Sequence, residues 1–413
     1  MKMITRLFVP VLVMTLIVST AATAGTVFQN PDFDYVVDIP VGWEILDARE
    51  SNFVSFADPD RVAVFQIIAF PGDRFVTAAD LDAFIRDRFG AAGDQSPFRY
   101  HGDHAIFADY SFTTTSEITV RGYMTFINGD EYDFAVMTYA VEDFYEEVHD
   151  TLLSALDGFS PDARHRMQPG PVSTFYAAPI KEQLAAGVYD SDRGSSSLAL
   201  PSGAEYQLPP RVASEGLREA AQVVIEREAR VLGNYAPAQG DSPRIGDGPV
   251  PDWARAWRRY FRMIYRDSYD RLEPVAEAVF GDLAESGVSR EEMPARILAW
   301  LQTARYERTG SLSDLMSPAW CPVEFAGDCD SLGLTYAIIL QHLGFDAILM
   351  VSMEYAHAVA AVDVPGQGAR FPFEGRHWLV AELTAEVAIG QIAEDMSDIG
   401  GWVGVKLDPT VPW

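Results

Sequence analysis

The chain has 413 residues, 48% of them hydrophobic, so it is long enough to bury large cores and its length favours two or three globular domains. Its formal net charge of -29 at pH 7 would repel a polyanion over most of the surface, which argues against nucleic acid or an anionic membrane as a partner. With 2 cysteines in total, the protein is not a disulfide-stabilised scaffold.

Residues 1–24 have the features of a secretory signal peptide. A basic start precedes an apolar run over 7–18, and small residues at 22–24 form a cleavage site ahead of Gly25. An uncleaved membrane anchor is the alternative, although the run is short for a bilayer span. No later run approaches the roughly 18 apolar residues that a spanning helix needs. We therefore expect an exported bacterial protein, periplasmic or secreted, without an integral membrane segment after cleavage.

Residues 25–162 predict one α+β unit, an antiparallel sheet with flanking helices. Alternating apolar and polar residues between turn signals predict strands at 33–40, 62–70, 106–113, 117–127 and 132–140. Amphipathic spacing predicts helices at 79–89 and 142–156. His101 and His104 are close enough in sequence to suggest a metal pair, but no third ligand lies nearby, so we interpret them as ordinary surface histidines.

Two segments of this unit resemble the PsbP/Mog1-like family. Residues 35–43 form a strand followed by Pro-x-Gly-Trp, and residues 152–161 form a terminal helix followed by Phe-Ser-Pro. The resemblance covers about a third of the chain. It implies a binding or adaptor domain without catalytic machinery of its own.

Residues 163–251 are rich in Gly, Pro and Ser, which is typical of an interdomain linker. We expect little regular structure there except one helix at 214–232, which has Ser214 as its N-cap and Gly233 as its stop.

A helical layer is expected next, with helices at 253–272, 273–286 and 290–306. Arg258, Arg262 and Arg266 lie four apart on one face of it. They suit either a clamp for a carboxylate or phosphate or a solvated face with Arg-acid pairs. We favour the solvated face, because isolated charge stripes usually face water.

Cys329 is the residue that most clearly indicates chemistry. Asp328 is a suitable N-cap for a largely apolar helix that stops at Gly344, so Cys329 falls in the first turn. Free backbone N–H groups and the helix dipole stabilise a thiolate there. His357 opens an expected strand and Glu382 lies at the end of another, so a helix packed on an antiparallel sheet would bring the three side chains together.

The region 297–390 resembles the transglutaminase-like superfamily of papain-type cysteine enzymes. It contains Gly-Asp-Cys before a helix that ends in Leu-Gly-Phe, then His357, then Trp378-Leu-Val-Ala-Glu382-Leu-Thr384. The resemblance implies an α+β, papain-like helix and antiparallel sheet over residues 252–413, with Cys329, His357 and Glu382 as a catalytic triad. Glu382 stands where the family has Asp. By position, Gln302 is expected to supply an oxyanion donor.

The implied reaction is attack of Cys329 on an amide or ester carbonyl, with no metal or cofactor. Water as the second nucleophile makes a protease or amidase, and an amine makes a transglutaminase. For an exported bacterial chain we favour hydrolysis of a peptide or protein substrate, including cell-wall peptide.

Several alternatives stay open at this point. Cys329 could be a buried structural thiol, or it could be joined to Cys321 in a disulfide that an oxidising compartment permits. Asp408, in Asp-Pro-Thr, could replace Glu382 as the acid, although its Trp402 stands six residues before it instead of four. The whole chain could also be a non-catalytic envelope scaffold that retains the fold.

Overall fold

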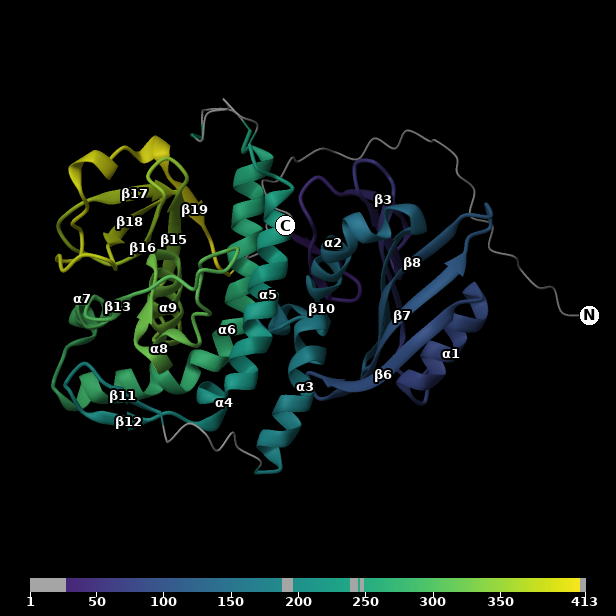
Figure 1. Ribbon diagram of the computed structural model, residues 1–413, viewed down its shortest axis with the longest axis horizontal. Helices are drawn as coiled ribbons and strands as arrows, with labels where there is room; N and C mark the ends of the chain where they lie inside the picture. The colour runs from purple at the N-terminus through teal and green to yellow at the C-terminus, as the bar shows by residue number, and fades with distance from the viewer. Residues whose placement is uncertain (1–26, 188–195, 238–243, 246–248, 409–413) are drawn as a thin grey trace, which may run out of the picture.

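The structure, a computed structural model, describes residues 27–187, 196–237, 244–245 and 249–408. The signal peptide expected at residues 1–24 lies outside this range. Two sheet-containing units stand at opposite ends of the molecule, and the helices α5 (Glu215–Gly233) and α6 (Asp252–Glu285) lie between them (Figure 1). The fold is therefore α+β, as the sequence predicts.

The N-terminal unit is built on a seven-stranded antiparallel sheet. Its spatial order is β3 (Glu44–Glu50), β4 (Phe53–Ala57), β5 (Ala63–Pro71), β9 (Tyr132–Val141), β8 (Thr119–Asn128), β7 (Asp103–Thr113) and β6 (Ala92–Tyr100). Alternate side chains enter two cores: Phe107 faces the helix α2 (Tyr145–Asp157), whereas Ile106 faces the helix α1 (Ala78–Phe89). The two helices therefore cover opposite faces of the sheet.

Several strands of this unit were not predicted, although β2 (Val36–Asp38) lies within the strand expected at 33–40. A small second sheet joins β1 (Val27–Gln29), β2 and β10 (Phe159–Ser160). The strands β3, β4 and β6 also went unpredicted. The edge strand β6 contains Pro97 and is largely exposed, so it has no apolar alternation, and a proline is tolerated at a sheet edge.

The expectation of an almost unstructured linker over 163–251 is wrong for its first part. The helix α3 (Pro171–Ala185) packs against α2 and α5, and Ser173 in its first turn donates its backbone N–H to Asp157 Oδ1 at 2.9 Å. Proline is often a loop residue, but Pro171 occupies the first helical turn, where a missing N–H costs nothing. A hairpin of β11 (Ser197–Ala199) and β12 (Glu205–Gln207) and the short helix α4 (Pro210–Ala213) follow, ahead of the expected helix α5.

The helical layer differs from prediction in two respects. The helix expected at 290–306 ends at Leu301, before a strand at Arg305–Tyr306. Residues 252–285 form the single helix α6, with Pro274 inside it, where two helices were expected. The helix α7 (Met293–Leu301) follows, and then come the short parallel pair β13 (Arg305–Tyr306) and β14 (Ala326–Gly327) and the helix α8 (Cys321–Glu324). No helix in the described part of the chain has the length and hydropathy of a bilayer span.

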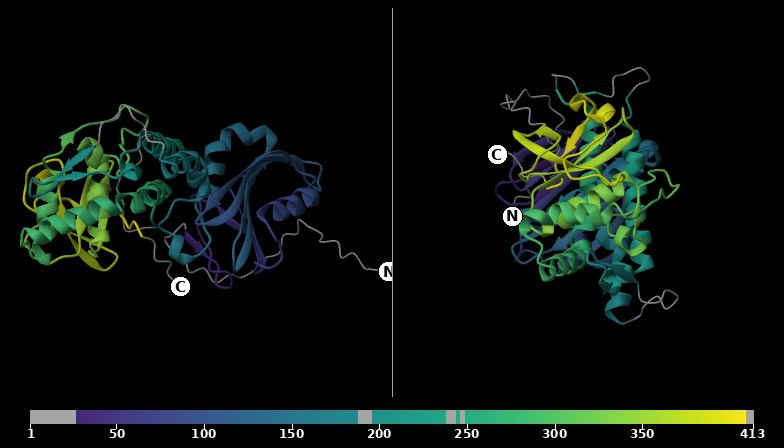
Figure 2. Two further views of the ribbon diagram at one scale, coloured as in Figure 1. Left: turned by 90° about the horizontal axis from the view of Figure 1, so that it is seen from below. Right: turned by 90° about the vertical axis from the view of Figure 1, so that its left-hand side faces the viewer.

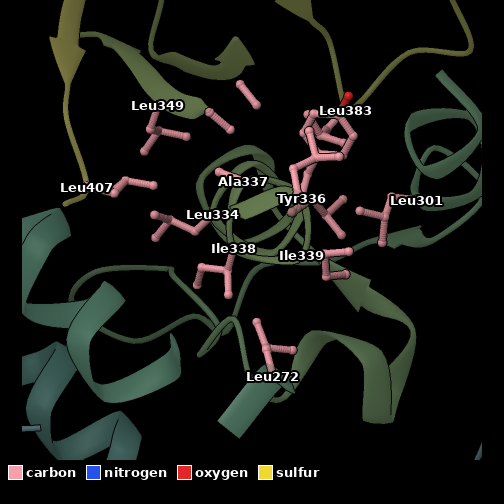
Figure 3. Packing of buried hydrophobic residues seen from close by; sticks show 14 of the residues in the cluster. Leu272, Leu301, Leu334, Tyr336, Ala337, Ile338, Ile339, Leu349, Leu383 and Leu407 are labelled. Atoms are coloured by element: carbon pink, nitrogen blue, oxygen red, sulfur yellow. The ribbon is translucent and has the colours of Figure 1, made fainter. Parts of the chain in front are cut away.

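The C-terminal unit packs the helix α9 (Cys329–His342) on a five-stranded antiparallel sheet. The strand order is β17 (Arg370–Phe373), β18 (Arg376–Ala381), β16 (His357–Val362), β15 (Ala347–Ser352) and β19 (Val403–Val405). In Figure 3, Leu334 and Ala337 of α9 lie toward Leu349 of the sheet, and Ile338 lies toward Leu272 of α6. Apolar contacts on both sides therefore hold α9 between the sheet and α6.

The arginine stripe of α6 is not a solvated face. Arg262 is 7% exposed and forms a two-pronged pair with Asp38 of the N-terminal unit, at 2.7 and 2.9 Å. Arg266 is 5% exposed and donates to the backbone carbonyls of Asp157 and Phe159. Arg258 donates to the carbonyl of Gly404. Helical spacing alone does not distinguish a solvated stripe from a buried one, because the partners lie more than 100 residues away.

These contacts make α6 the connection between the two ends of the molecule. Arg259 adds hydrogen bonds from the same helix to Ser154 Oγ at 2.6 Å and to the carbonyl of Asp38. The view from below in Figure 2 shows the helices filling the space between the two sheets.

Candidate active site

Cys329 is the first residue of α9, and Asp328 caps the helix. The backbone of Asp328 is extended, and its Oδ1 accepts the N–H of Ser331 at 2.8 Å and the Ser331 hydroxyl at 2.5 Å. This is the cap that the sequence predicts. The result is a thiol in the first turn that is only 5% exposed.

The strand β16 lies against α9 and begins at His357, so the thiol is close to that residue's backbone. The backbone N–H groups of Ala358 and Asp330 act to lower the pKa of the Cys329 thiol. The ring of His357 is mostly buried, with its side chain 12% exposed.

Glu382 binds one nitrogen of the His357 imidazole. The antiparallel register of β16 and β18, in which Ala360 faces Ala381, brings the residue after β18 to the start of β16. The distance from His357 Nε2 to Glu382 Oε2 is 2.7 Å. Because Nε2 is bound to Glu382, Nδ1 is the ring nitrogen that Glu382 leaves free.

Thr384 holds the second oxygen of Glu382. Its backbone N–H and its hydroxyl both donate to Oε1 at 2.7 Å. Burial raises the pKa of Glu382, but the hydrogen bond and charge of His357, together with the Thr384 bonds, lower it below its usual value. The carboxylate is therefore ionised at neutral pH and fixed in position. The role of Thr384 was not predicted, although the residue belongs to the motif around Glu382.

Gln302 does not have the geometry of an oxyanion donor. Its Nε2 donates to the carbonyl of Glu382 at 2.8 Å and to the carbonyl of Val387 at 2.9 Å. Both amide hydrogens are thus used to hold the chain around Glu382. The expected oxyanion role is replaced by a positioning one. Trp402 also helps to position His357, since its ring packs edge-on to the imidazole with the centroids 6.3 Å apart.

The position of Cys329 at a helix N-terminus lowers the pKa of its thiol, but the surroundings of the side chain raise it. Burial and the charges of Asp330 and Asp328 raise the pKa of Cys329 to about 12, and the two backbone donors offset this only in part. Burial and the charge of Asp328 also raise the pKa of Asp330 to about 7, while His357 and Arg308 act in the opposite direction. The resting thiol is therefore protonated at neutral pH, which the sequence did not predict.

Asp408 and Cys321 have other partners. Both oxygens of Asp408 are bound by Arg166, at 2.8 and 2.9 Å, so this carboxylate pairs with a guanidinium instead of His357. Cys321 and Cys329 are both free and buried. The Cys321 thiol donates to the carbonyl of Ser317, and burial raises its pKa to about 12. The disulfide weighed from the sequence is absent in this state.

The two histidines of the N-terminal unit have separate surroundings. His101 is half-buried: its Nε2 is buried, its ring stacks on His165 with the centroids 4.5 Å apart, and burial lowers its pKa to about 3. His104 is exposed on β7. Within the described residues, no group of three or more His, Cys, Asp or Glu side chains has the arrangement of a metal site.

No protein-family model and no curated protein matches the chain. Similar solved structures include a cyanobacterial PsbP (CyanoP) from Synechocystis sp. PCC 6803, with 14% identity over 35% of this chain and 96% of that one and a TM-score of 0.29. Protein PA94 of Pseudomonas aeruginosa, a putative regulator, is 15% identical over 30% of this chain and 88% of its own, with a TM-score of 0.21. A crystal structure from Bacteroides thetaiotaomicron covers 86% of this chain and 89% of its own at 10% identity and a TM-score of 0.25. Similarities this low support no argument about function.

Proposed function

We propose that the protein is an exported, transglutaminase-like cysteine enzyme that attacks peptide-type amide carbonyls through Cys329, His357 and Glu382. The observation that carries the proposal is the 2.7 Å contact between His357 Nε2 and Glu382 Oε2, beside a thiol that opens a helix. A carboxylate, an imidazole and a nucleophile in this order form the general arrangement for covalent acyl transfer.

The reaction would proceed through a thioester. As the Cys329 sulfur bonds to the carbonyl carbon, His357 Nδ1 takes the thiol proton, and Glu382 stabilises the imidazolium that forms. The backbone N–H of Cys329, at the start of α9, is the natural donor to the oxyanion. Collapse breaks the carbon–nitrogen bond, and His357 returns its proton to the leaving amine. Water then attacks the thioester, loses a proton to His357, and releases the acid and the thiol.

The raised pKa of Cys329 favours one of two ways of activating the thiol. A thiol with a pKa of about 12 does not form a resting ion pair with His357. Deprotonation by His357 during attack suits this site better. We favour hydrolysis over transamidation, with a peptide or protein substrate in the periplasm or outside the cell, including cell-wall peptide.

A second function is favoured by one specific observation. The Cys329 side chain is nearly buried, and its pKa is as high as that of the structural thiol Cys321. These properties suit a non-catalytic envelope scaffold that keeps the fold without the reaction.

Alkylation with iodoacetamide at pH 7 distinguishes the two functions, and Cys321 serves as an internal reference for a buried thiol. The enzyme is expected to alkylate at Cys329 about tenfold faster than at Cys321, and to lose that advantage in His357→Ala. Peptide mapping by mass spectrometry reads both sites in one sample. Equally slow alkylation of both thiols, with and without His357, would support the scaffold. Alkylation that requires prior reduction would indicate a disulfide.

A further inference from the structure

Arg308 lies beside the candidate nucleophile because of a short parallel strand pair. In β13 and β14, Tyr306 faces Gly327, and the N–H of Glu307 donates to the carbonyl of Gly327 at 3.0 Å. If the parallel register is extended, β13 runs on to Arg308 beside the point where β14 runs on to Asp328 and Cys329. Paired strands lie about 4.8 Å apart, so the side chain of Arg308 starts next to the first turn of α9.

The guanidinium of Arg308 is accessible and only loosely held. Its side chain is 54% exposed, and its contacts are long: 3.4 Å from Nε to the Tyr306 hydroxyl and 3.5 Å from Nη1 to Asp314. Nη2 has no hydrogen-bond partner within the described residues. The hydrogen bond with Tyr306 and the nearby carboxylate of Asp314 raise the pKa of Arg308, so it is a permanent cation at this site.

Arg305, three residues earlier, is an example of a guanidinium that is paired with a carboxylate. Its Nε and Nη2 both bind Glu307, at 2.8 and 2.5 Å. Arg308 has no comparable pair, although carboxylates are near. Asp314 uses its other oxygen to accept the N–H of Gly310, and Asp328 accepts the N–H of Ser331 as the N-cap of α9. The N–H groups of Nη2, and the second N–H of the loosely held Nη1, thus remain available to a carboxylate from outside the chain.

We propose that Arg308 is a specificity-determining residue that binds a carboxylate of the substrate close to the scissile carbonyl. This inference rests on the proposed function and names its substrate class: peptide-type amides with an adjacent negative charge. The charge belongs either to a terminal carboxylate or to an acidic side chain. Arg308 recognises both through the same two-pronged hydrogen bonding. Tyr306, 51% exposed, lies on the same strand and offers an apolar surface beside the charge.

Two alkylating reagents of similar size test the inference, because iodoacetate carries a carboxylate and iodoacetamide does not. The measured quantity is the ratio of their rates at Cys329. Replacement of Arg308 by Gln is expected to lower this ratio about fivefold, the scale of a partly exposed ion pair. The ratio corrects for any change in the reactivity of the thiol itself. An unchanged ratio in Arg308→Gln would overturn the proposal.

Two further variants separate a specific contact from a general field. Arg305→Gln removes the same charge from the same strand and is expected to leave the ratio within about twofold of the wild type, because long-range charge effects are screened. Arg308→Lys keeps the charge but not the paired donors, so an intermediate ratio is expected. If Arg305→Gln lowered the ratio as much as Arg308→Gln, the effect would come from net charge, and the assignment to Arg308 would be wrong.

Binding experiments identify the source of the carboxylate and do not need a reactive thiol. The ligands are N-acetyl-alanyl-alanine for a terminal carboxylate and N-acetyl-glutamic acid amide for an acidic side chain, each compared with its uncharged amide by calorimetry. A charged ligand that binds more tightly than its neutral form, and loses that advantage in Arg308→Gln, supports the proposal and names the source. An advantage that persists in Arg308→Gln, or no advantage for either ligand, overturns it. If Cys329 fails to alkylate, the proposed function fails, and this experiment still decides the role of Arg308.

Discussion

At the scale of single residues, the Cys329 thiol experiences opposing influences. The start of α9 and two backbone donors favour a thiolate, whereas burial and the carboxylates of Asp330 and Asp328 favour the protonated thiol and outweigh them. Within the described residues no cation forms an ion pair with Asp330, and its own pKa rises to about 7. Burial and the residue next to the nucleophile therefore both oppose ionisation of the thiol.

Replacement of Asp330 by Asn is expected to increase stability only above mildly acidic pH. Below about pH 4, the usual range of an Asp pKa, the carboxyl is protonated in both folded and unfolded chains and contributes nothing. Between pH 4 and 7 the unfolded chain releases a proton that the folded one keeps, so the folded state is penalised, fully so above pH 7. At pH 8 the variant is expected to be more stable by about 1–2 kcal/mol in urea unfolding, and equal to the wild type at pH 4.

Asp87→Asn, on the exposed side of α1, is the matched control and is expected to change stability by less than about 0.5 kcal/mol at either pH. The same Asp330→Asn variant is expected to alkylate severalfold faster at Cys329, because one neighbouring negative charge is gone. A stability gain that was the same at pH 4 and pH 8 would contradict this account of Asp330.

At the scale of elements, the start of α9 depends on its cap. Asp328 fixes the first turn by accepting both the N–H and the hydroxyl of Ser331, and that hydroxyl in turn accepts the N–H of Met316. The cap thus connects the helix that presents Cys329 to the loop before α8. Movement of the first turn would carry the thiol away from Ala358 on β16.

Asp328→Ala is expected to destabilise the protein by about 1–2 kcal/mol and to abolish the reactivity difference between Cys329 and Cys321. Asp328→Asn retains a side-chain oxygen for the Ser331 N–H, so it should remain close to the wild type in stability. Thermal unfolding and alkylation of the two variants give the comparison. Equal losses in both would mean that charge, and not capping, is the contribution of Asp328.

At the scale of the whole molecule, buried ion pairs join the N-terminal unit to α6. Asp38 accepts two hydrogen bonds from Arg262, and both side chains are at least 92% buried within this interface. A buried pair contributes little net stability when intact, but loss of one partner leaves the other charge without compensation. The N-terminal unit is therefore fixed against the helix on which α9 also packs.

Asp38→Ala is expected to cost about 3 kcal/mol or more in urea unfolding, because Arg262 would keep its charge without its carboxylate. Asp47→Ala is the matched control, since Asp47 forms an Arg–Asp pair with Arg49 on the exposed strand β3, and its loss should cost less than about 1 kcal/mol. Similar small losses for both would show that the interface is hydrated in solution.

Features that depend on local pattern could be predicted from the sequence. The alternation of β7 and β8 and the cap before Cys329 are examples, because period and capping are encoded by neighbouring residues. The short strand β13 could not be predicted, since two residues have no period and pair with β14 about 20 positions later. The burial of the arginine stripe and the formation of α3 were also mispredicted, because both depend on partners that are remote in sequence.

In the candidate site too, local features could be predicted from the sequence, whereas contacts between distant residues could not. The elements carrying Cys329, His357 and Glu382 were anticipated from residue order and motif, and the structure brings His357 and Glu382 into contact. The use of Gln302 was mispredicted because it depends on the chain path at Val387, which no local pattern encodes. Arg308 gave no sequence signal, since its proximity to Cys329 comes only from the pairing of β13 with β14.

The central claim is that Cys329 accepts an acyl group with the help of His357, and incubation with p-nitrophenyl acetate tests it most directly. Attack by the sulfur transfers the acetyl group to Cys329 and releases p-nitrophenolate. The account predicts a burst of p-nitrophenolate equal to the protein concentration, an acetyl group located on Cys329 by mass spectrometry, and loss of both in Cys329→Ala and His357→Ala. An absence of acetyl-Cys329 in the wild type, or equal acetylation in His357→Ala, would contradict it.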